Sequence, residues 1–195
     1  MTLFRLLFIA WLACLAGCAT GYVAVGPGQV SIQDLDVEAA PGWNRVPAEE
    51  IPWARRGMQA WTRNGMSLDR LVLIPGVADG ESIYLPRNNI VYPLFRADMS
   101  TPQQLALVKE TIELAQGANQ TEVTADNSRA HQFGRRDGIL FDLRAVVHDG
   151  PEYRGTGGAF VDGDRFYLLY FLGAVPYYYE QFAAPALATI ESASL

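Results

Sequence analysis

A run of residues near the C-terminus places the strongest constraint on the fold. Residues 165–172 read Arg-Phe-Tyr-Leu-Leu-Tyr-Phe-Leu, so large apolar side chains occupy both alternating faces of an extended chain. Such a strand has no face that suits water, and it predicts a central strand covered on both sides. With 50% hydrophobic and 18% charged residues over 195 positions, the chain can bury one layered domain of ordinary size.

Further strands are expected on either side of this run. Residues 139–147 alternate between apolar and polar side chains, which predicts a strand with one buried face. Residues 153–162 predict the next strand, bulged or broken at its glycines. Asn64-Gly65 predicts a hairpin between residues 57–63 and 68–74, because both turn residues tolerate positive φ. Residues 75–89 are rich in Gly, Pro and Asp and predict a loop.

Two helices complete the predicted fold. The first opens at Thr101-Pro102, with Thr101 as the cap and Gln104 completing a capping box, and Gly117 ends it. Its apolar residues recur at helical spacing: Leu105, Val108, Ile112 and Ala115. The second helix is expected within residues 176–195, where Pro185 opens its second half or kinks it. The consistent fold class is α+β, a mainly antiparallel sheet with helices packed on it.

The N-terminus predicts export and lipidation. Arg5 precedes a short uncharged apolar run, the layout of a secretory signal peptide. Leu15, Ala16, Gly17 and Cys18 then match the four positions of the bacterial lipobox, the recognition sequence of the lipoprotein signal peptidase. We therefore expect a signal peptide over residues 1–17, lipid attachment at Cys18, a lipidated tether over 18–30 and a single α+β domain over 31–195. An uncleaved helix or plain secretion is the alternative.

The same reading predicts where the protein is located. The lipid would hold the domain to a membrane of the bacterial cell envelope. By resemblance to enteric lipoproteins, Ala19 in place of aspartate favours the outer membrane, with the domain facing the periplasm. Cleavage before Cys18 would also remove Cys14 and leave no free thiol, which excludes disulfides and cysteine-ligated metals.

A series of short motifs extends from Leu35 to Ser192. In chain order they are Pro41-Gly42-Trp43, Trp61-Thr62 with Gly65, Leu68-Asp69-Arg70-Leu71, the group Phe95, Met99, Pro102 and Leu105, Phe133-Gly134, Tyr153-Arg154-Gly155 and the strand 167–171. Together they resemble the PsbP/Mog-like superfamily, which includes a photosystem II subunit, a Ran-binding factor and many bacterial lipoproteins. The resemblance implies an α-β-α sandwich that works by binding partners and has no catalytic residues.

The residues themselves offer little chemistry. The sequence has no nucleophile-elbow, zinc-protease or phosphate-loop motif, and it predicts neither a metal site nor a cofactor. A formal net charge of −6 argues against nucleic acid as a partner. His148, with Asp149 and Glu152 nearby in sequence, leaves a hydrolase as a minor alternative.

The main functional hypothesis is therefore a protein-binding module with an envelope protein as its partner. The candidate partner surface consists of three arginines and two tyrosines: Arg135, Arg136, Arg154, Tyr177 and Tyr178. The aromatic-rich C-terminal half keeps open a second hypothesis, a carrier of an apolar or amphipathic small ligand.

Overall fold

The structure, a computed structural model, describes residues 21–87, 89–117 and 119–195. The predicted signal peptide and the lipid attachment at Cys18 lie outside these residues. The elements are β1 (Val23–Ala24), β2 (Gly28–Ile32), β3 (Leu35–Ala39), β4 (Asn44–Arg45), a short 3₁₀ turn (Ala48–Glu50), β5 (Gln59–Thr62), β6 (Asp69–Ala78), α2 (Thr101–Gln116), β7 (Thr121–Phe133), β8 (Arg136–Val147), β9 (Glu152–Asp162), β10 (Arg165–Ala174) and α3 (Tyr177–Glu191).

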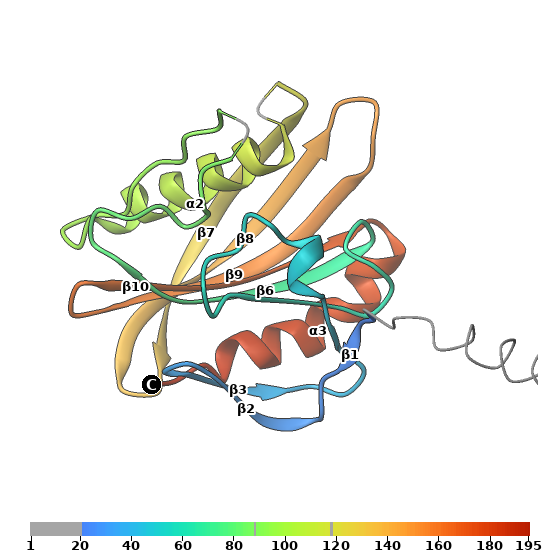
Figure 1. The fold of residues 1–195 in the computed structure, drawn as a ribbon, viewed down its shortest axis with the longest axis horizontal. Coiled ribbons are helices and arrows are strands. Elements are labelled where there is room, and N and C mark those ends of the chain that lie inside the picture. The colour runs from blue at the N-terminus through green and yellow to red at the C-terminus, as the bar shows by residue number, and fades with distance from the viewer. Residues whose placement is uncertain (1–20, 88, 118) are drawn as a thin grey trace, which may run out of the picture.

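The strands form one large sheet and one separate hairpin. The large sheet has the order β1-β4-β5-β6-β10-β9-β8-β7, and every neighbouring pair is antiparallel. Strands β2 and β3 pair only with each other. Figure 1 shows α2 above the large sheet, and α3 together with the β2–β3 hairpin below it. The chain is thus α+β in three layers, as predicted, with a hairpin added to one outer layer.

Strand β10 confirms the prediction of a strand buried on both faces. It pairs with β6 on one side and β9 on the other. Tyr170 and Leu172 pack into the core under α2, whereas Tyr167 and Phe171 pack into the core over α3 and the hairpin. The alternation places each side chain in one of two separate cores, so neither face meets water.

The glycines of β9 correct the expectation of a bulge. Strand β9 pairs with β8 and β10 in continuous register throughout its length. Each glycine instead lies where a Cβ would collide with a neighbour. At Gly155 that neighbour is the Phe171 carbonyl, at Gly157 the Phe141 ring, and at Gly158 the side chains of α3 and β7. The glycines allow close packing rather than a break in the ladder.

The β5–β6 hairpin is present, but its turn differs from the expected one. Gly65 has a positive φ of 110°, whereas Asn64 does not belong to the positive-φ residues. The buried carboxylate of Asp69 organises the turn instead: it accepts from the Arg63 N–H at 2.6 Å, from the Asn64 N–H at 3.0 Å and from the Thr62 hydroxyl at 3.0 Å. A longer turn held by one carboxylate replaces a two-residue turn.

Strand β6 continues into the segment expected to be a loop. The strand runs to Ala78, so the predicted loop 75–89 begins too early by four residues. Pro75 is accommodated because the pairing with β10 shifts register there, with Ile74 opposite Leu168 and Val77 opposite Phe166. The extra residues on β6 form a bulge, which is where a sheet tolerates proline.

The boundaries of α2 and of the tether also need correction. Ser100 rather than Thr101 caps α2, since both its N–H and its hydroxyl donate to Gln103 Oε1 at 2.8 Å. The predicted end at Gly117 is confirmed, with φ of 98°. The expected tether, 18–30, contains β1 and the start of β2, because Val23 and Ala24 pair with β4. The folded domain therefore begins before residue 31.

Candidate functional site

The three predicted arginines do not form one patch. Arg136 opens β8, and its Nε lies 2.5 Å from Asp162 Oδ1. Arg154 lies on β9 opposite Arg144 of β8. Arg144 is eight residues beyond Arg136 on that strand, so at about 3.3 Å per residue Arg154 is about 26 Å from Arg136. There Glu152 accepts from Arg144 at 2.9 Å and from Arg154 at 3.3 Å. Two of the three arginines are thus neutralised locally, in different parts of the sheet.

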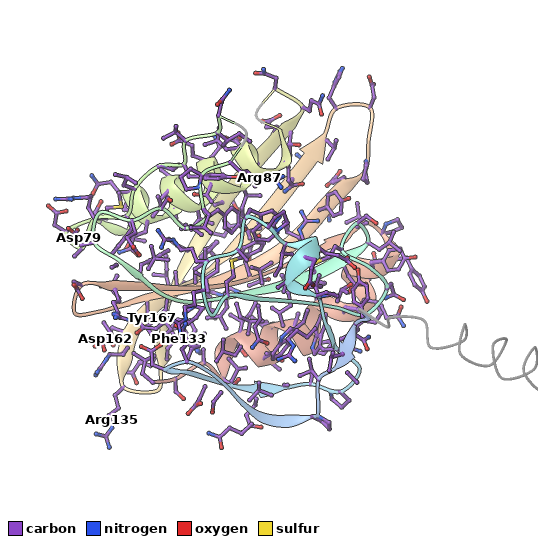
Figure 2. All side chains as sticks on the ribbon, viewed as in Figure 1. Asp79, Arg87, Phe133, Arg135, Asp162 and Tyr167 are labelled. Atoms are coloured by element: carbon purple, nitrogen blue, oxygen red, sulfur yellow. The ribbon has the colours of Figure 1, made fainter. Side chains whose placement is uncertain are left out.

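The two predicted tyrosines lie far from Arg135. Tyr177 is 62% exposed and meets the half-buried Tyr178 edge to face, with ring centroids 5.2 Å apart. They begin α3, whereas Arg135 lines a surface hollow with Leu195, beyond the other end of that helix. A helix of 15 residues is about 22 Å long, and Figure 2 shows Arg135 projecting away from the domain. The predicted set therefore does not make one surface.

His148 is placed on an exposed turn. Its side chain is 81% exposed, and Nε2 lies 3.4 Å from an Asp149 carboxylate that is 90% exposed. Within the described residues, no hydrogen bond joins the ring to a serine hydroxyl. Glu152, the third residue of that predicted cluster, is engaged by Arg144 and Arg154. A general base needs a held partner in a sheltered site, and this geometry does not provide one.

Three of the seven large apolar side chains that are exposed in the described residues lie in residues 79–100, which we call the connecting segment because it joins β6 to α2. Leu85, Val91 and Leu94 are 40%, 78% and 51% exposed. The sequence analysis missed this surface, because it predicted a loop over residues 75–89, which includes Leu85, and assigned no surface role to Val91 or Leu94. The only sequence signal was the presence of large apolar residues in a stretch otherwise rich in Gly, Pro and Asp.

The connecting segment is held firmly although it has little regular structure. Four of its side chains are buried in the core under α2: Ile83, Tyr84, Tyr92 and Phe95. Phe95 also donates its N–H to the Glu81 carbonyl at 2.7 Å and accepts from the Gly80 N–H at 2.9 Å. Buried anchors on one side and backbone bonds across the loop fix the exposed residues in place.

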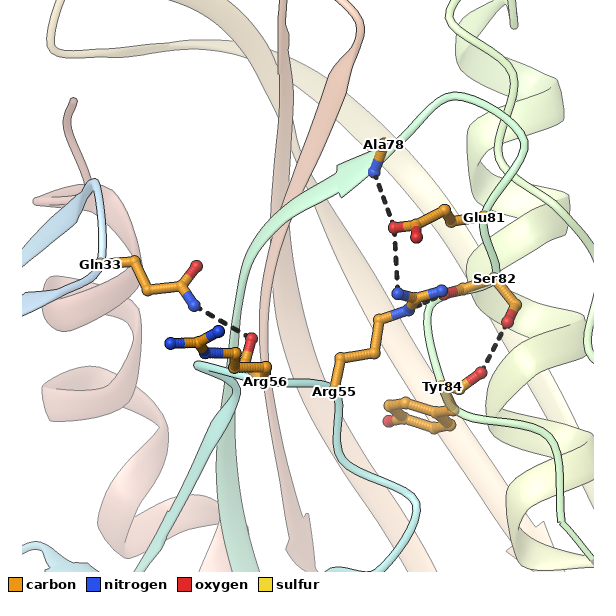
Figure 3. Close-up of polar contacts among 7 residues, drawn as sticks. All are labelled: Gln33, Arg55, Arg56, Ala78, Glu81, Ser82 and Tyr84. Carbon is orange, nitrogen blue, oxygen red and sulfur yellow. Dashed lines mark hydrogen bonds and ion pairs between the residues drawn. The ribbon is translucent and has the colours of Figure 1, made fainter.

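Arg55 ties the connecting segment to the preceding part of the chain. Its Nε donates to the Ser82 carbonyl at 2.5 Å, and its Nη1 pairs with Glu81 Oε2 at 2.9 Å (Figure 3). The Ser82 hydroxyl donates to the Tyr84 carbonyl at 2.7 Å, and Glu81 also accepts from the Ala78 N–H at 3.4 Å. This network fixes the backbone at the point where the segment leaves β6.

A cavity lies between the connecting segment, the sheet and the C-terminal end of α2. Its volume is about 170 Å³, and its main lining residues are Trp53, Arg70, Tyr84, Ile112, Gln116 and Tyr170. The hydroxyls of Tyr84 and Tyr170 are hydrogen-bonded to each other, and burial raises the pKa of both. Sites for drug-sized ligands usually measure about 300–1,000 Å³, so this one suits only a small molecule.

Over residues 21–87, 89–117 and 119–195, no group of three or more His, Cys, Asp or Glu side chains is arranged to hold a metal ion. None of the helices found there is long and apolar enough to cross a membrane.

Comparison with known proteins identifies the fold. No family model matches the chain, and no curated protein sequence matches it. Among solved structures, it is similar to the solution structure of cyanobacterial PsbP (CyanoP) from Synechocystis sp. PCC 6803, with a TM-score of 0.58 and 12% sequence identity. The match covers 93% of this chain and 99% of that one. The fold is therefore PsbP-like over nearly the whole length.

Proposed function

We propose that this protein is a non-enzymatic, lipid-anchored module of the bacterial cell envelope that binds a protein partner through the connecting segment. The observation that carries the proposal is the exposure of Leu85, Val91 and Leu94 on a backbone held by buried anchors. A PsbP-like fold is compatible with such a binding module. Large apolar side chains that remain exposed on a firmly held backbone are typical of a site that a partner covers.

The charges around this surface favour a protein partner over lipid head groups. Two nearby arginines are paired with acids: Arg96 lies 3.3 Å from Asp79, and Arg55 lies 2.9 Å from Glu81. Within the described residues, Arg87 is the one arginine of the segment that has no ion pair. Binding to anionic lipids needs a cluster of unpaired basic side chains. Exposed apolar side chains with a single unpaired arginine in the same segment instead resemble an interface between proteins.

Photo-crosslinking in cells tests this surface. A photoreactive residue in place of Val91 in the intact, anchored protein should capture a defined protein. The same photoreactive residue in place of Tyr177, which is exposed at the start of α3, is the matched control. Leu94→Asp should abolish the Val91 adduct, because it places a charge among the exposed apolar residues of the connecting segment, while Tyr177→Asp should leave that adduct unchanged. If Leu94→Asp leaves the Val91 adduct intact, or if only Tyr177 captures the partner, the connecting segment is not the docking surface.

The anchor supports the proposed location in the outer membrane, facing the periplasm. The Leu15-Ala16-Gly17-Cys18 sequence behind an apolar leader supports the anchor itself, and Ala19 in place of aspartate favours the outer membrane. Cys18→Ser should abolish incorporation of radioactive palmitate and leave a precursor that retains residues 1–17. Cys14→Ser is the matched control and should be labelled and processed normally. Normal labelling of the Cys18→Ser protein would overturn the proposed anchor.

A further inference from the structure

The cavity beneath the connecting segment has a positive lining. Arg70 and Gln116 contribute a guanidinium and an amide, and none of the residues that line the cavity carries a carboxylate. Arg70 has no ion pair with an acid within residues 21–87, 89–117 and 119–195. The protein has a formal net charge of −6, whereas this cavity contains a cation and no acid, so the charge of the cavity is opposite in sign to that of the whole protein.

The polar groups of the cavity converge from three different elements. Arg70 lies opposite Leu172 in the β6–β10 ladder, so Arg70 and Tyr170 share one face of neighbouring strands. Tyr84 arrives from the connecting segment, and its hydroxyl meets that of Tyr170. Gln116 comes from the last turn of α2, and its buried Nε2 has no hydrogen-bond partner among the described residues.

These groups still have hydrogen bonds to donate. Arg70 donates from Nη1 to the Met66 carbonyl at 3.1 Å, and its guanidinium lies 5.0 Å above the Tyr153 ring. A guanidinium has five N–H donors, so others stay available. In the Tyr84–Tyr170 pair only one hydroxyl hydrogen is used between the rings, and the other hydroxyl can donate elsewhere. A buried Nε2 with no acceptor is costly unless something pairs with it.

The remaining wall is apolar and aromatic, with the ring planes of Trp53 and Tyr84 inclined at 52° to each other. Trp53 and Tyr84 lie 4.5 Å apart between ring centroids, and Ile112 faces the cavity from α2. The volume of about 170 Å³ is close to that of an engineered cavity of about 150 Å³ that binds benzene. Trp53, Arg70 and Gln116 are half-buried, so the cavity is open to small solutes.

We propose that this cavity binds a small monocarboxylate with a planar apolar body, with the carboxylate held by Arg70 and Gln116 and the body lying against Trp53 and Tyr84. This goes beyond the proposed docking function, because it requires neither a partner protein nor the exposed residues of the connecting segment. Hydrogen-bond donors with no acid beside them favour an anion, and the aromatic side chains favour a ligand with an apolar ring that can pack against them.

Titrations monitored by NMR test the proposal with benzoate as the probe and with the full chain in a mild detergent. Benzoate should shift the indole N–H resonance of Trp53 in a saturable manner. The indoles of Trp43 and Trp61 should not respond, because both lie in the core on the opposite face of the sheet. Benzylamine and benzyl alcohol keep the ring and replace the carboxylate by a cation and a neutral group, and each should bind at least about tenfold more weakly than benzoate.

Variants separate the cavity from general effects of charge. Arg70→Met should weaken the binding of benzoate by at least about tenfold. Arg129→Met is the control: it removes an arginine of β7 that is paired with Asp142 of β8, and it should leave the affinity for benzoate unchanged. Should Arg70→Met fail to fold, Tyr170→Phe provides the test, with Tyr167→Phe on the opposite face of the same strand as its control. Tyr170→Phe should lower the affinity for benzoate several-fold, because it removes a hydroxyl that can donate to the carboxylate.

Three results would each overturn the proposal. One is the lack of a Trp53 shift at about 10 mM benzoate, which exceeds the dissociation constant expected for even a weak ligand of this size. Another is equal binding of benzylamine or benzyl alcohol. The third is an equal loss of affinity in Arg70→Met and Arg129→Met. None of these results bears on crosslinking from Val91, so the docking function would stand or fall separately.

Discussion

Alanine at position 158 should dislodge α3 from the sheet. Gly158 lies in β9 and faces α3 directly. A Cβ added there would lie 2.6 Å from Ile190 Cγ2 on α3, and 2.9 Å from Cζ of Phe133 on β7. Carbon atoms in good contact are about 3.5–4.0 Å apart, so the neighbours would have to retreat by about 1 Å.

Neither neighbour can move easily. Ile190 and Phe133 are fully buried, and Ile190 is β-branched with few alternative rotamers. The Phe133 ring is held between His131, at 4.7 Å between centroids, and Phe160, at 4.9 Å. Overpacking of this kind typically costs about 1–3 kcal/mol, and the rigid surroundings place Gly158→Ala near the upper end. At roughly 2–4 °C per kcal/mol for a chain of this size, the melting temperature should fall by about 5–10 °C.

Thermal unfolding of the full chain, followed by circular dichroism, measures this effect against two controls. Gly26→Ala has open space around its Cβ and should stay within about 0.5 kcal/mol of the wild type. Gly163→Ala also has open space, but its φ of 61° adds backbone strain without overpacking. Ile190→Ala should relieve part of the Gly158→Ala defect, a coupling that a double-mutant cycle detects. If the melting temperature of Gly158→Ala equals that of the wild type, the overpacking argument is wrong.

Two further predictions concern stability. Trp61→Ala should lower the free energy of unfolding by about 3–5 kcal/mol, because it leaves a cavity at a fully buried site over α3. His148→Ala, on an exposed turn, should stay within about 0.5 kcal/mol of the wild type. Denaturant titration of both variants measures the difference. Burial, together with the hydrogen bond to Asp34, raises the pKa of Tyr167 from 10.0 to about 12. The folded state therefore holds this proton more tightly. Its contribution is complete below about pH 10 and is lost as the pH rises through about 12, so the alkaline fall in the denaturant midpoint should shrink in Tyr167→Phe.

The elements that could be predicted from sequence are those whose environment is uniform along their length. Strand β10 is buried on both faces from Phe166 to Ala174, so nearly every residue in it is apolar and the sequence shows the burial directly. Strand β7 was missed because it is an edge strand whose middle, from Asp126 to Ala130, is polar or small and largely exposed. Natural edge strands are protected by such charges and by bulges, and the register shift between Asp126 and Arg129 is one. The features that protect the edge also remove the apolar alternation.

The glycines of β9 show a second kind of limit. A glycine within a strand is consistent both with a bulge and with the close approach of another element. The choice depends on what lies opposite, and for Gly158 that is Ile190, which is remote in sequence. The tether boundary failed for a related reason, since β1 is held by the backbone of β4 and not by apolar side chains of its own. Pairing between distant segments leaves no periodic signal in either of them.

The same limit applies most strongly to the connecting segment. An irregular backbone has no repeating face, so the sequence cannot show that Tyr84 and Tyr92 point inward while Leu85 and Val91 point outward. Both pairs are large and apolar, and composition treats them alike. Only the packing in the core under α2 separates the anchors, which position the segment and of which Tyr84 also lines the cavity, from the residues left in contact with water. Exposure of a residue as large as Val91 next to such anchors costs free energy in the isolated domain, and a partner that covers Val91 would recover it. The search for a partner should therefore begin at Val91 rather than at the arginines that the sequence brought forward.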